Sequence, residues 1–211
     1  MEVDEAIVSR ASVKKFADRD VPKELIEKCL ELAVWAPNHR LTEPWRFRVV
    51  TDRGRDAIAD VIREQLASDS SRVDQTEGTA NAETKGLFSG PLQFTATVKS
   101  SIAAEQVRRK IMSAPVLIVV YSLRAVDETL TRENFAATAA AVQNLLLGAH
   151  HLGLAAIWRT ADYFAGDKAR AFLQIPAEAD FVAAVYLGFP DQRETTRKRT
   201  PAQQWTVWFQ H

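Results

Sequence analysis

Residues 114–122, APVLIVVYS, form a nearly continuous run of apolar side chains, several of them β-branched. A strand with one face in water alternates apolar and polar residues, whereas an uninterrupted run is expected of a central strand that is covered on both faces. A sheet built around such a strand needs other elements packed on each side. The run therefore predicts a layered fold with this strand at its centre.

Other strand and helix patterns interleave along the chain without an internal repeat. Strands are predicted where short β-branched or aromatic runs occur, at residues 47–51, 155–158 and 181–188. Helices are predicted where apolar residues recur at helical spacing, over residues 3–10, 22–36, 58–66, 101–112, 132–152 and 166–174. A chain of 211 residues with 46% hydrophobic side chains can build one sizeable core. The alternation therefore predicts a single α/β or α+β domain over residues 1–211.

Several residues are predicted to mark helix ends. Asp20 is expected as the N-cap of the helix that Pro37 ends, and Asp167 as the N-cap of the last helix. Gly153 is expected to end the helix over 132–152. That helix is alanine-rich and apolar on nearly every side, so we expect it to be buried all round, either in the core of the monomer or at a large subunit interface.

Two segments are expected to lie outside the core. Residues 68–84 are rich in Ser, Asp, Thr, Glu and Gly, and too few of their side chains can be buried to offset the entropy of ordering them. They predict a mobile excursion that is either disordered or a lid over a site. The tail over 189–211 contains three aromatic residues in WTVWF, which would be costly to leave in water, so we expect it to pack on a partner subunit.

Charge and composition exclude several classes of protein. The 27 basic and 27 acidic side chains balance, so no global field attracts nucleic acid or an anionic membrane. The acidic start MEVDEAIVSR does not resemble a signal peptide, and no segment has the ~20 apolar residues of a membrane span, which predicts a cytoplasmic protein. Motifs with metal-ligand spacing are absent, so no metal site is predicted. The single cysteine, Cys29, is expected to be a core thiol.

The sequence also lacks GxGxxG and P-loop motifs, so any bound phosphate must be held by side chains. In RASVK, the residues Arg10, Ser12 and Lys14 alternate, and on extended chain they would lie on one face. A guanidinium, a hydroxyl and an ammonium together could hold a monophosphate. Arg197 and Arg199 repeat the alternation near the other end. Each cluster can also be read as a solvated basic surface.

The segment IWRT, residues 157–160, follows a buried helix and a short strand. A strand that ends in Trp158, Arg159 and Thr160 places backbone N–H and C=O groups at a sheet edge, where a planar heterocycle could be bound by hydrogen bonds. Trp158 by itself indicates no site, because a tryptophan at a strand end more often fills the core or its rim.

These motifs together resemble the nitroreductase family of flavoenzymes. The resemblance is carried, in order, by RASVKKF, APNHRLTEPWRF, AAAVQNLLLGAHHLGL with IWRT, and YLGFP. It spans essentially the whole chain. The sequence is most similar to a short bacterial branch of NAD(P)H nitroreductases, in which the loop reads APxH and the later motif reads WRS or WRT.

The resemblance implies an α+β fold, a nitroreductase-like α/β sandwich in which helices flank a central mixed sheet. It also implies an intertwined homodimer with one FMN in each of two clefts at the subunit interface. The segment at 10–14 would hold the phosphate and ribityl side, the loop at 37–45 would reach the flavin of the partner, the segment at 158–160 would line the ring, and the late basic residues would lie at the phosphate. Residue by residue, the implied cofactor-binding set is Arg10, Ala11, Ser12, Lys14, His39, Glu43, Trp158, Arg159, Thr160, Arg197 and Arg199.

The implied activity is transfer of hydride from NADH or NADPH to flavin N5, followed by reduction of a nitroaromatic, a quinone or a similar acceptor, with ping-pong kinetics. Because the flavin carries this chemistry, no side chain is assigned as acid, base or nucleophile. Arg159 or Lys14 is the candidate cation that stabilises the anionic reduced flavin. Two alternatives stay open: a flavin-binding sensor or storage dimer without reductase turnover, and a specialised flavin dehydrogenase.

Two loop residues allow a second interpretation. His39 could be an ordinary polar loop histidine. At Glu43 the family more often has Gln or Asn, and a carboxylate can accept hydrogen bonds but cannot donate them, and it would repel a phosphate or a reduced flavin. Arg40 and Arg46 are the candidates to neutralise this carboxylate.

Overall fold

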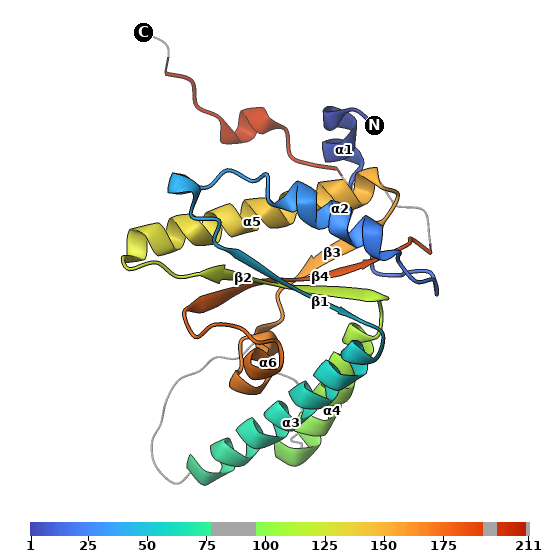
Figure 1. Ribbon diagram of the computed structural model, residues 1–211, viewed down its shortest axis with the longest axis vertical. Helices are drawn as coiled ribbons and strands as arrows, with labels where there is room; N and C mark the ends of the chain where they lie inside the picture. Colours follow the sequence, from blue (N-terminus) through green and yellow to red (C-terminus); the bar gives the residue numbers. More distant parts are fainter. Residues whose placement is uncertain (77–95, 192–197, 210–211) are drawn as a thin grey trace.

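The computed structural model describes residues 1–76, 96–191 and 198–209. Its centre is a four-stranded sheet with the order β1-β2-β4-β3, in which every neighbouring pair of strands is antiparallel. Helices cover both faces of the sheet (Figure 1), so the predicted α+β class is confirmed. The strands are β1 (Trp45–Thr51), β2 (Val116–Leu123), β3 (Ala155–Arg159) and β4 (Ala179–Gly188).

The helices divide between the two faces. Side chains of α2 and α5 pack on one face, and side chains of α3, α4 and α6 pack on the other. Their bounds are α1 (Val3–Ser9), α2 (Lys23–Ala33), α3 (Asp52–Thr76), α4 (Ala96–Ile111), α5 (Glu128–His151) and α6 (Asp167–Phe172), with 3-10 turns η1 (His39–Leu41), η2 (Asp162–Phe164) and η3 (Ala202–Trp205). None of the helices in the described ranges is long and apolar enough to cross a membrane.

Strand β2 is the buried centre that its sequence predicts. It pairs with β1 on one side and β4 on the other, and seven of its eight residues are buried. Ile118 and Val120 pack towards α2 and α5, while Leu117 and Val119 pack towards the opposite layer. This alternation follows from the two-residue period of a strand. The strand is therefore covered on both faces over almost its whole length.

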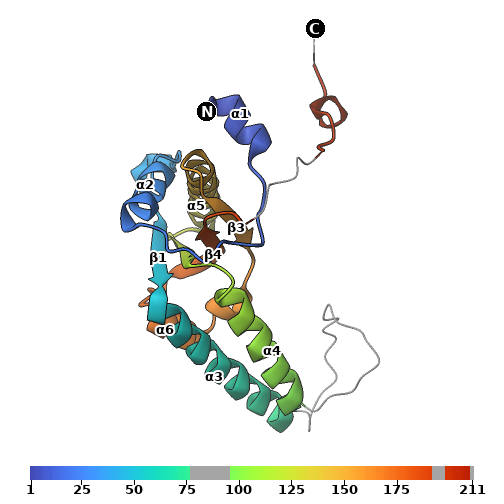
Figure 2. The same ribbon diagram turned by 90° about the vertical axis from the view of Figure 1, so that its right-hand side faces the viewer.

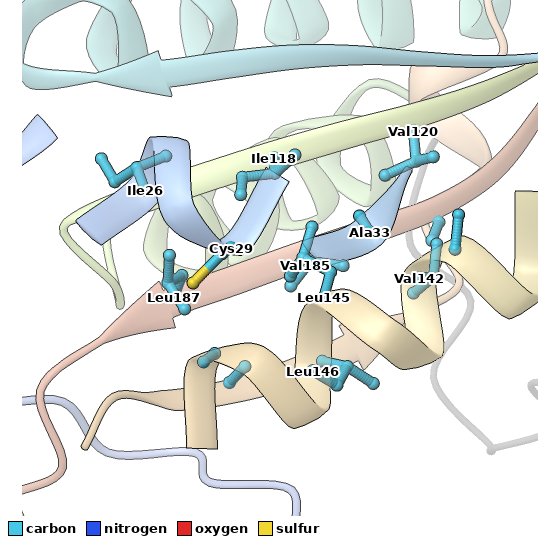
Figure 3. Packing of buried hydrophobic residues seen from close by; sticks show 14 of the residues in the cluster. Ile26, Cys29, Ala33, Ile118, Val120, Val142, Leu145, Leu146, Val185 and Leu187 are labelled. Atoms are coloured by element: carbon cyan, nitrogen blue, oxygen red, sulfur yellow. The ribbon is translucent and has the colours of Figure 1, made fainter. Parts of the chain in front are cut away.

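Cys29 lies inside the α2–α5 layer, as predicted. Its side chain is fully buried between the helix and the sheet, close to Leu145, Val185 and Leu187 (Figure 3). Burial raises the pKa of the thiol to about 11, because the apolar surroundings disfavour the thiolate. Cys29 is therefore a core residue and not a reactive thiol.

Two of the predicted caps are wrong. Helix α2 begins after Pro22, and Asp20 makes no capping hydrogen bond to it. Helix α6 begins after Gly166, so Asp167 lies in the first turn of the helix. Proline at a helix start supplies a suitable backbone angle without a side-chain cap, which explains the first error. Gly153 does end α5: it follows the C-cap and has a φ of 75°, a conformation that favours glycine.

Helix α5 is not buried all round in a single chain, which corrects the prediction. Ten of its residues are buried, among them Ala141, Leu145 and Ala149. The opposite side, with Arg132 and Gln143, is exposed. Burial within one chain therefore does not by itself explain the alanine-rich pattern. The alternative, burial of the helix at a subunit interface, stays open.

The predicted mixed character of the sheet rests on one short contact. Outside the antiparallel strands, the described residues contain a parallel bridge between Ser12 and Ala156 and an antiparallel bridge between Phe16 and Pro190. The N-terminal segment thus lies along the outer edge of β3.

The two peripheral segments are only partly described. Helix α3 continues to Thr76, so the first nine residues of the predicted excursion at 68–84 are helical, and residues 77–84 lie outside the described residues. The mobility of that segment stays a prediction. In the tail, η3 and the residues after it extend away from the sheet (Figure 2), and Trp205, Trp208 and Phe209 are 77%, 77% and 85% exposed.

Candidate functional site

The extended segment that follows α1 brings the predicted phosphate-binding residues to the outer edge of β3. The backbone N–H of Val13 donates to the carbonyl of Ala156 at 3.2 Å, beside the Ser12 bridge. Ala11 and Val13 are buried, whereas Ser12 is half-buried and Lys14 is exposed. Side chains alternate along extended chain, so the buried pair faces the protein and Ser12 and Lys14 face outwards.

Strand β3 ends at this same edge with the second predicted group. Trp158 is 36% exposed, Arg159 is half-buried and Thr160 is exposed. Only one residue, Ile157, separates Trp158 from the strand position that pairs with Ser12. The fold therefore joins the segments 10–14 and 158–160, which lie about 145 residues apart in the sequence.

Arg159 is held without a carboxylate partner. Its guanidinium lies 5.2 Å from the centre of the Tyr186 ring, and its Nε is buried without a hydrogen-bond partner. Behind it, the hydroxyl groups of Tyr163 and Tyr186 are 3.3 Å apart, and burial raises the pKa of both tyrosines, so both stay neutral at physiological pH. Ion pairs to Arg159 are absent from the described part of the chain. The site thus contains a cation with an unused donor.

The loop residues His39 and Glu43 lie elsewhere. They are exposed and belong to the connection between α2 and β1, and β1 is the edge strand farthest from β3. Three strand spacings of about 4.8 Å separate the two edges by roughly 14 Å. One chain therefore carries the predicted cofactor-binding residues as two separate groups, one at each edge of the sheet.

The loop has a strained backbone. Arg40, Leu41 and Glu43 have φ values of 54°, 52° and 42°. Each residue other than glycine in this left-handed region costs on the order of 1–3 kcal/mol, and such strain persists only where the surroundings enforce it.

The carboxylate of Glu43 is not neutralised as expected. The Arg46 guanidinium donates instead to the backbone carbonyls of Glu43, at 3.1 Å, and Trp45, at 2.8 Å. Among residues 1–76, 96–191 and 198–209, no ion pair joins Glu43 to Arg40 or Arg46, so the predicted neutralisation is wrong for this chain.

Of the two late basic residues, the structure describes one. Arg197 lies outside the described residues, and Arg199 is exposed in the tail. Their role at a phosphate stays a prediction.

Sequence reasoning missed two polar contacts that hold the site segments. Thr42 of the loop donates to Asn134 of α5 at 2.8 Å, and Ser9, next to Arg10, lies 2.7 Å from Nε2 of His150, also on α5. The available signal was the presence of Asn134 and His150 in an otherwise alanine-rich and apolar helix. A polar residue in such a helix needs a partner.

The structure is an α+β sandwich of three layers, with a basic extended segment along one sheet edge and a polar loop of strained backbone before the opposite edge strand. The chain belongs to the nitroreductase family, whose family model matches residues 7–189. It is 28% identical over 196 residues to a Bacillus subtilis protein named "Putative NAD(P)H nitroreductase YfhC", an alignment that covers 92% of this chain and 88% of the relative.

Solved structures show the same fold. The nitroreductase-like family protein from Bacillus cereus superposes with a TM-score of 0.78 at 23% identity, over 100% of this chain and 97% of the other. The FMN-dependent nitroreductase NfnB from Mycobacterium smegmatis, solved in complex with NADPH, gives a TM-score of 0.68 at 19% identity, over 98% and 97% of the two chains. The predicted nitroreductase-like fold is thereby confirmed.

Proposed function

We propose that this protein is a cytoplasmic, homodimeric, FMN-dependent oxidoreductase that uses NADH or NADPH to reduce a nitroaromatic, a quinone or a similar acceptor by a ping-pong mechanism. Membership of the nitroreductase family supports the proposal, as do the names of its relatives, which include NAD(P)H, FMN and NADPH. The observation that carries it is the pairing of the segment 10–14 with β3, beside Trp158, Arg159 and Thr160.

The residues at this edge fit FMN. Arg10, Ser12 and Lys14 would hold the phosphate, because two cations and a hydroxyl on one face match a doubly charged monophosphate without a glycine-rich loop. The backbone at 158–160 would line the ring. The buried Nε of Arg159 has no hydrogen-bond partner among the described residues, which is consistent with an acceptor atom supplied by a ligand.

Bound FMN would supply the two-electron chemistry, and the protein would supply binding, orientation and electrostatics. Arg159 would stabilise negative charge on the reduced ring, since a partly buried cation acts more strongly there than in water. The two tyrosines next to Arg159 are neutral, so they would not compete with the reduced ring for the positive charge of Arg159. Trp158 would shield one side of the ring from water.

A second copy of the chain would complete the site. Large apolar side chains are exposed on α1, at the end of α2 and in the loop, for example Val8 at 73%, Trp35 at 83% and Leu41 at 80%. An open groove of about 340 Å³ between α1, α2 and α5 is lined by Met1, Leu32 and other residues. Contiguous apolar surface of this kind is typical of a protein interface. We infer that the loop of one copy reaches the cofactor held at β3 of the other, and that the aromatic tail packs on the partner.

The experiment is to purify the protein, record its visible spectrum, identify the compound that heat releases, and measure NAD(P)H oxidation with a quinone or nitroaromatic acceptor. We expect a yellow protein, FMN in the supernatant and steady turnover. A yellow protein that does not oxidise NAD(P)H would support a sensor or storage dimer. A colourless monomer that does not bind added FMN would refute the proposal.

A further inference from the structure

The loop over residues 38–43 holds an unfavourable backbone conformation although its side chains gain little from contacts within the chain. Arg40, Leu41 and Glu43 all have left-handed φ values, and none of them is glycine. Leu41 is 80% exposed, and Arg40 and Glu43 are exposed as well. In this region the Cβ atom is crowded against the backbone, so a free loop would relax to other conformations. Something else in the chain must hold it.

Two amide side chains hold the loop. Asn38 fixes it internally: its Oδ1 accepts from the backbone N–H of Glu43 at 3.0 Å, and its Nδ2 donates to the carbonyl of Ala36 at 3.3 Å. Asn134 fixes it to the core: its Oδ1 accepts from the Thr42 hydroxyl at 2.8 Å. The loop is therefore closed on itself and attached to α5.

Asn134 continues this connection into the sheet. Its Nδ2 donates to the carbonyl of Leu123, the last residue of β2, at 3.1 Å. The residue is 5% exposed, and both polar atoms of its amide are used. The chain of bonds runs from the loop, through a buried side chain of α5, to the central strand β2.

An asparagine at this position is not needed for packing. Burial of an amide costs free energy unless it is hydrogen-bonded, and an apolar side chain of similar size would fill the same space without this requirement. What the amide adds is a directional contact to Thr42, one residue before Glu43 and three after His39. The contact therefore fixes the orientation of the exposed side chains of His39 and Glu43.

We propose that Asn134 and Thr42 are positioning residues. They hold the loop 38–43 in its strained conformation before the cofactor binds, so that His39 and Glu43 are already ordered when they contact the FMN held by a second copy of this chain. The inference rests on the proposed function. A loop that is ordered before the ligand arrives loses less conformational entropy on binding, so the contact with Asn134 strengthens cofactor binding without either residue touching the cofactor.

The test compares Thr42→Val with Thr42→Ser in the full-length protein. Valine has the shape of threonine but no hydroxyl, and it leaves Oδ1 of Asn134 without its donor, whereas serine keeps the hydroxyl. The FMN dissociation constant is measured on protein freed of flavin, by quenching of flavin fluorescence. Amide hydrogen exchange over residues 38–43 and the thermal unfolding midpoint are measured alongside.

We expect Thr42→Val to weaken FMN binding about tenfold, the effect of one lost hydrogen bond with a buried partner, and to speed exchange in the loop. Thr42→Ser should stay within twofold of the parent in both. If the parent binds FMN and the valine variant binds it equally well, the inference fails while the proposed function stands, even if the unfolding midpoint or the exchange rate changes. If the parent binds no FMN, the proposed function fails, and the inference with it.

Discussion

Gln65 joins two parts of the fold through a single buried side chain. It lies on α3 and is 6% exposed; its Nε2 donates to the carbonyl of Tyr163 at 2.9 Å and its Oε1 accepts from the N–H of Ala169 at 3.2 Å. Both amide atoms are therefore satisfied, as burial requires. The contact attaches α3 to η2 and α6, the elements that follow the predicted ring-binding segment.

Gly166 is required because the Gln65 amide occupies the space of a side chain. A Cβ atom at residue 166 would overlap with that amide. We expect Gly166→Ala to lower the free energy of unfolding by about 2 kcal/mol, through overpacking and loss of the amide hydrogen bonds. Urea denaturation measures the change. In a Gln65→Ala background the same substitution should cost clearly less, and an equal cost in both backgrounds would contradict the assigned contact.

Cys29 predicts a loss of stability at alkaline pH. Its pKa is about 11 in the folded protein and 9.0 for an unperturbed thiol. The raised pKa means that the stabilisation is complete below pH 9 and is lost between pH 9 and 11, as the unfolded thiol ionises first. The loss approaches about 2.7 kcal/mol, because one pKa unit corresponds to about 1.36 kcal/mol.

The measurement compares the free energy of unfolding of the parent and of Cys29→Ala at pH 8 and at pH 11. Burial also raises the pKa of Tyr121, to about 12, but this residue is present in both proteins, so the difference between them isolates the thiol. The alanine variant should lose less stability across this interval. Parallel pH curves would show that Cys29 is not as deeply desolvated as its burial indicates.

Helix α1 is an element whose placement depends on polar contacts more than on burial. None of its residues is buried. At its end, the Ser9 hydroxyl donates to the carbonyl of Glu5 at 2.6 Å and lies 2.7 Å from Nε2 of His150. Because the hydroxyl has one proton and a carbonyl can only accept, Nε2 of His150 must carry the proton that joins the two side chains. This contact joins the residue that precedes Arg10 to α5.

We therefore expect His150→Ala to loosen α1 and to displace Arg10 from the position in which it would hold the phosphate of the proposed FMN. FMN affinity should fall several-fold and amide exchange in α1 should rise, because the last turn of the helix loses a partner on the core. His150→Gln, whose amide can donate to Ser9, should recover part of both. Flavin fluorescence titration and hydrogen exchange provide the two measurements. Unchanged FMN affinity in the alanine variant would contradict a link between α5 and the phosphate-binding segment.

At the scale of the whole molecule, the predicted cofactor-binding residues form two groups at opposite edges of the sheet. Arg10, Ser12 and Lys14 lie beside β3, and His39 and Glu43 precede β1. Helix α5 contacts a residue next to each group: His150, near its end, contacts Ser9, and Asn134, nearer its start, contacts Thr42. In a dimer whose two sites each take one group from either copy, both groups of both chains would be used. The exposed face of α5 would then lie within reach of the interface.

Mixed dimers test this arrangement. One chain carries Arg10→Ala with Ser12→Ala, and the other carries His39→Ala with Glu43→Ala, each with its own affinity tag so that mixed dimers can be isolated. Either variant alone has two defective sites and should bind FMN weakly. If sites are shared between copies, the mixed dimer regains one site of parental affinity, because one intact half from each chain meets there. Flavin titration gives the stoichiometry. Absence of any recovered site would show that each chain builds its site alone.

The features that were predictable from the sequence depend on residues that are neighbours along the chain. The apolar run at 114–122 predicted a central strand, because a strand face in water would have needed polar side chains. Cys29 was predictable as a core thiol from its place on the apolar face of a helix, and the segment RASVK was predictable as extended chain from its alternation. At these positions the local pattern agrees with the tertiary structure, because the spacing of apolar residues follows the spacing of buried positions.

Which distant segments meet depends on how the strands and helices pack in three dimensions. The contact between Ser12 and Ala156 and the separation of His39 from Arg10 depend on the strand order, which no local pattern encodes. The strained loop, the hydrogen bond from Thr42 to Asn134 and the bonds of Arg46 to backbone carbonyls depend on geometry between elements. The sequence specifies which polar side chains are present, whereas the packing of the layers specifies which partner each of them contacts.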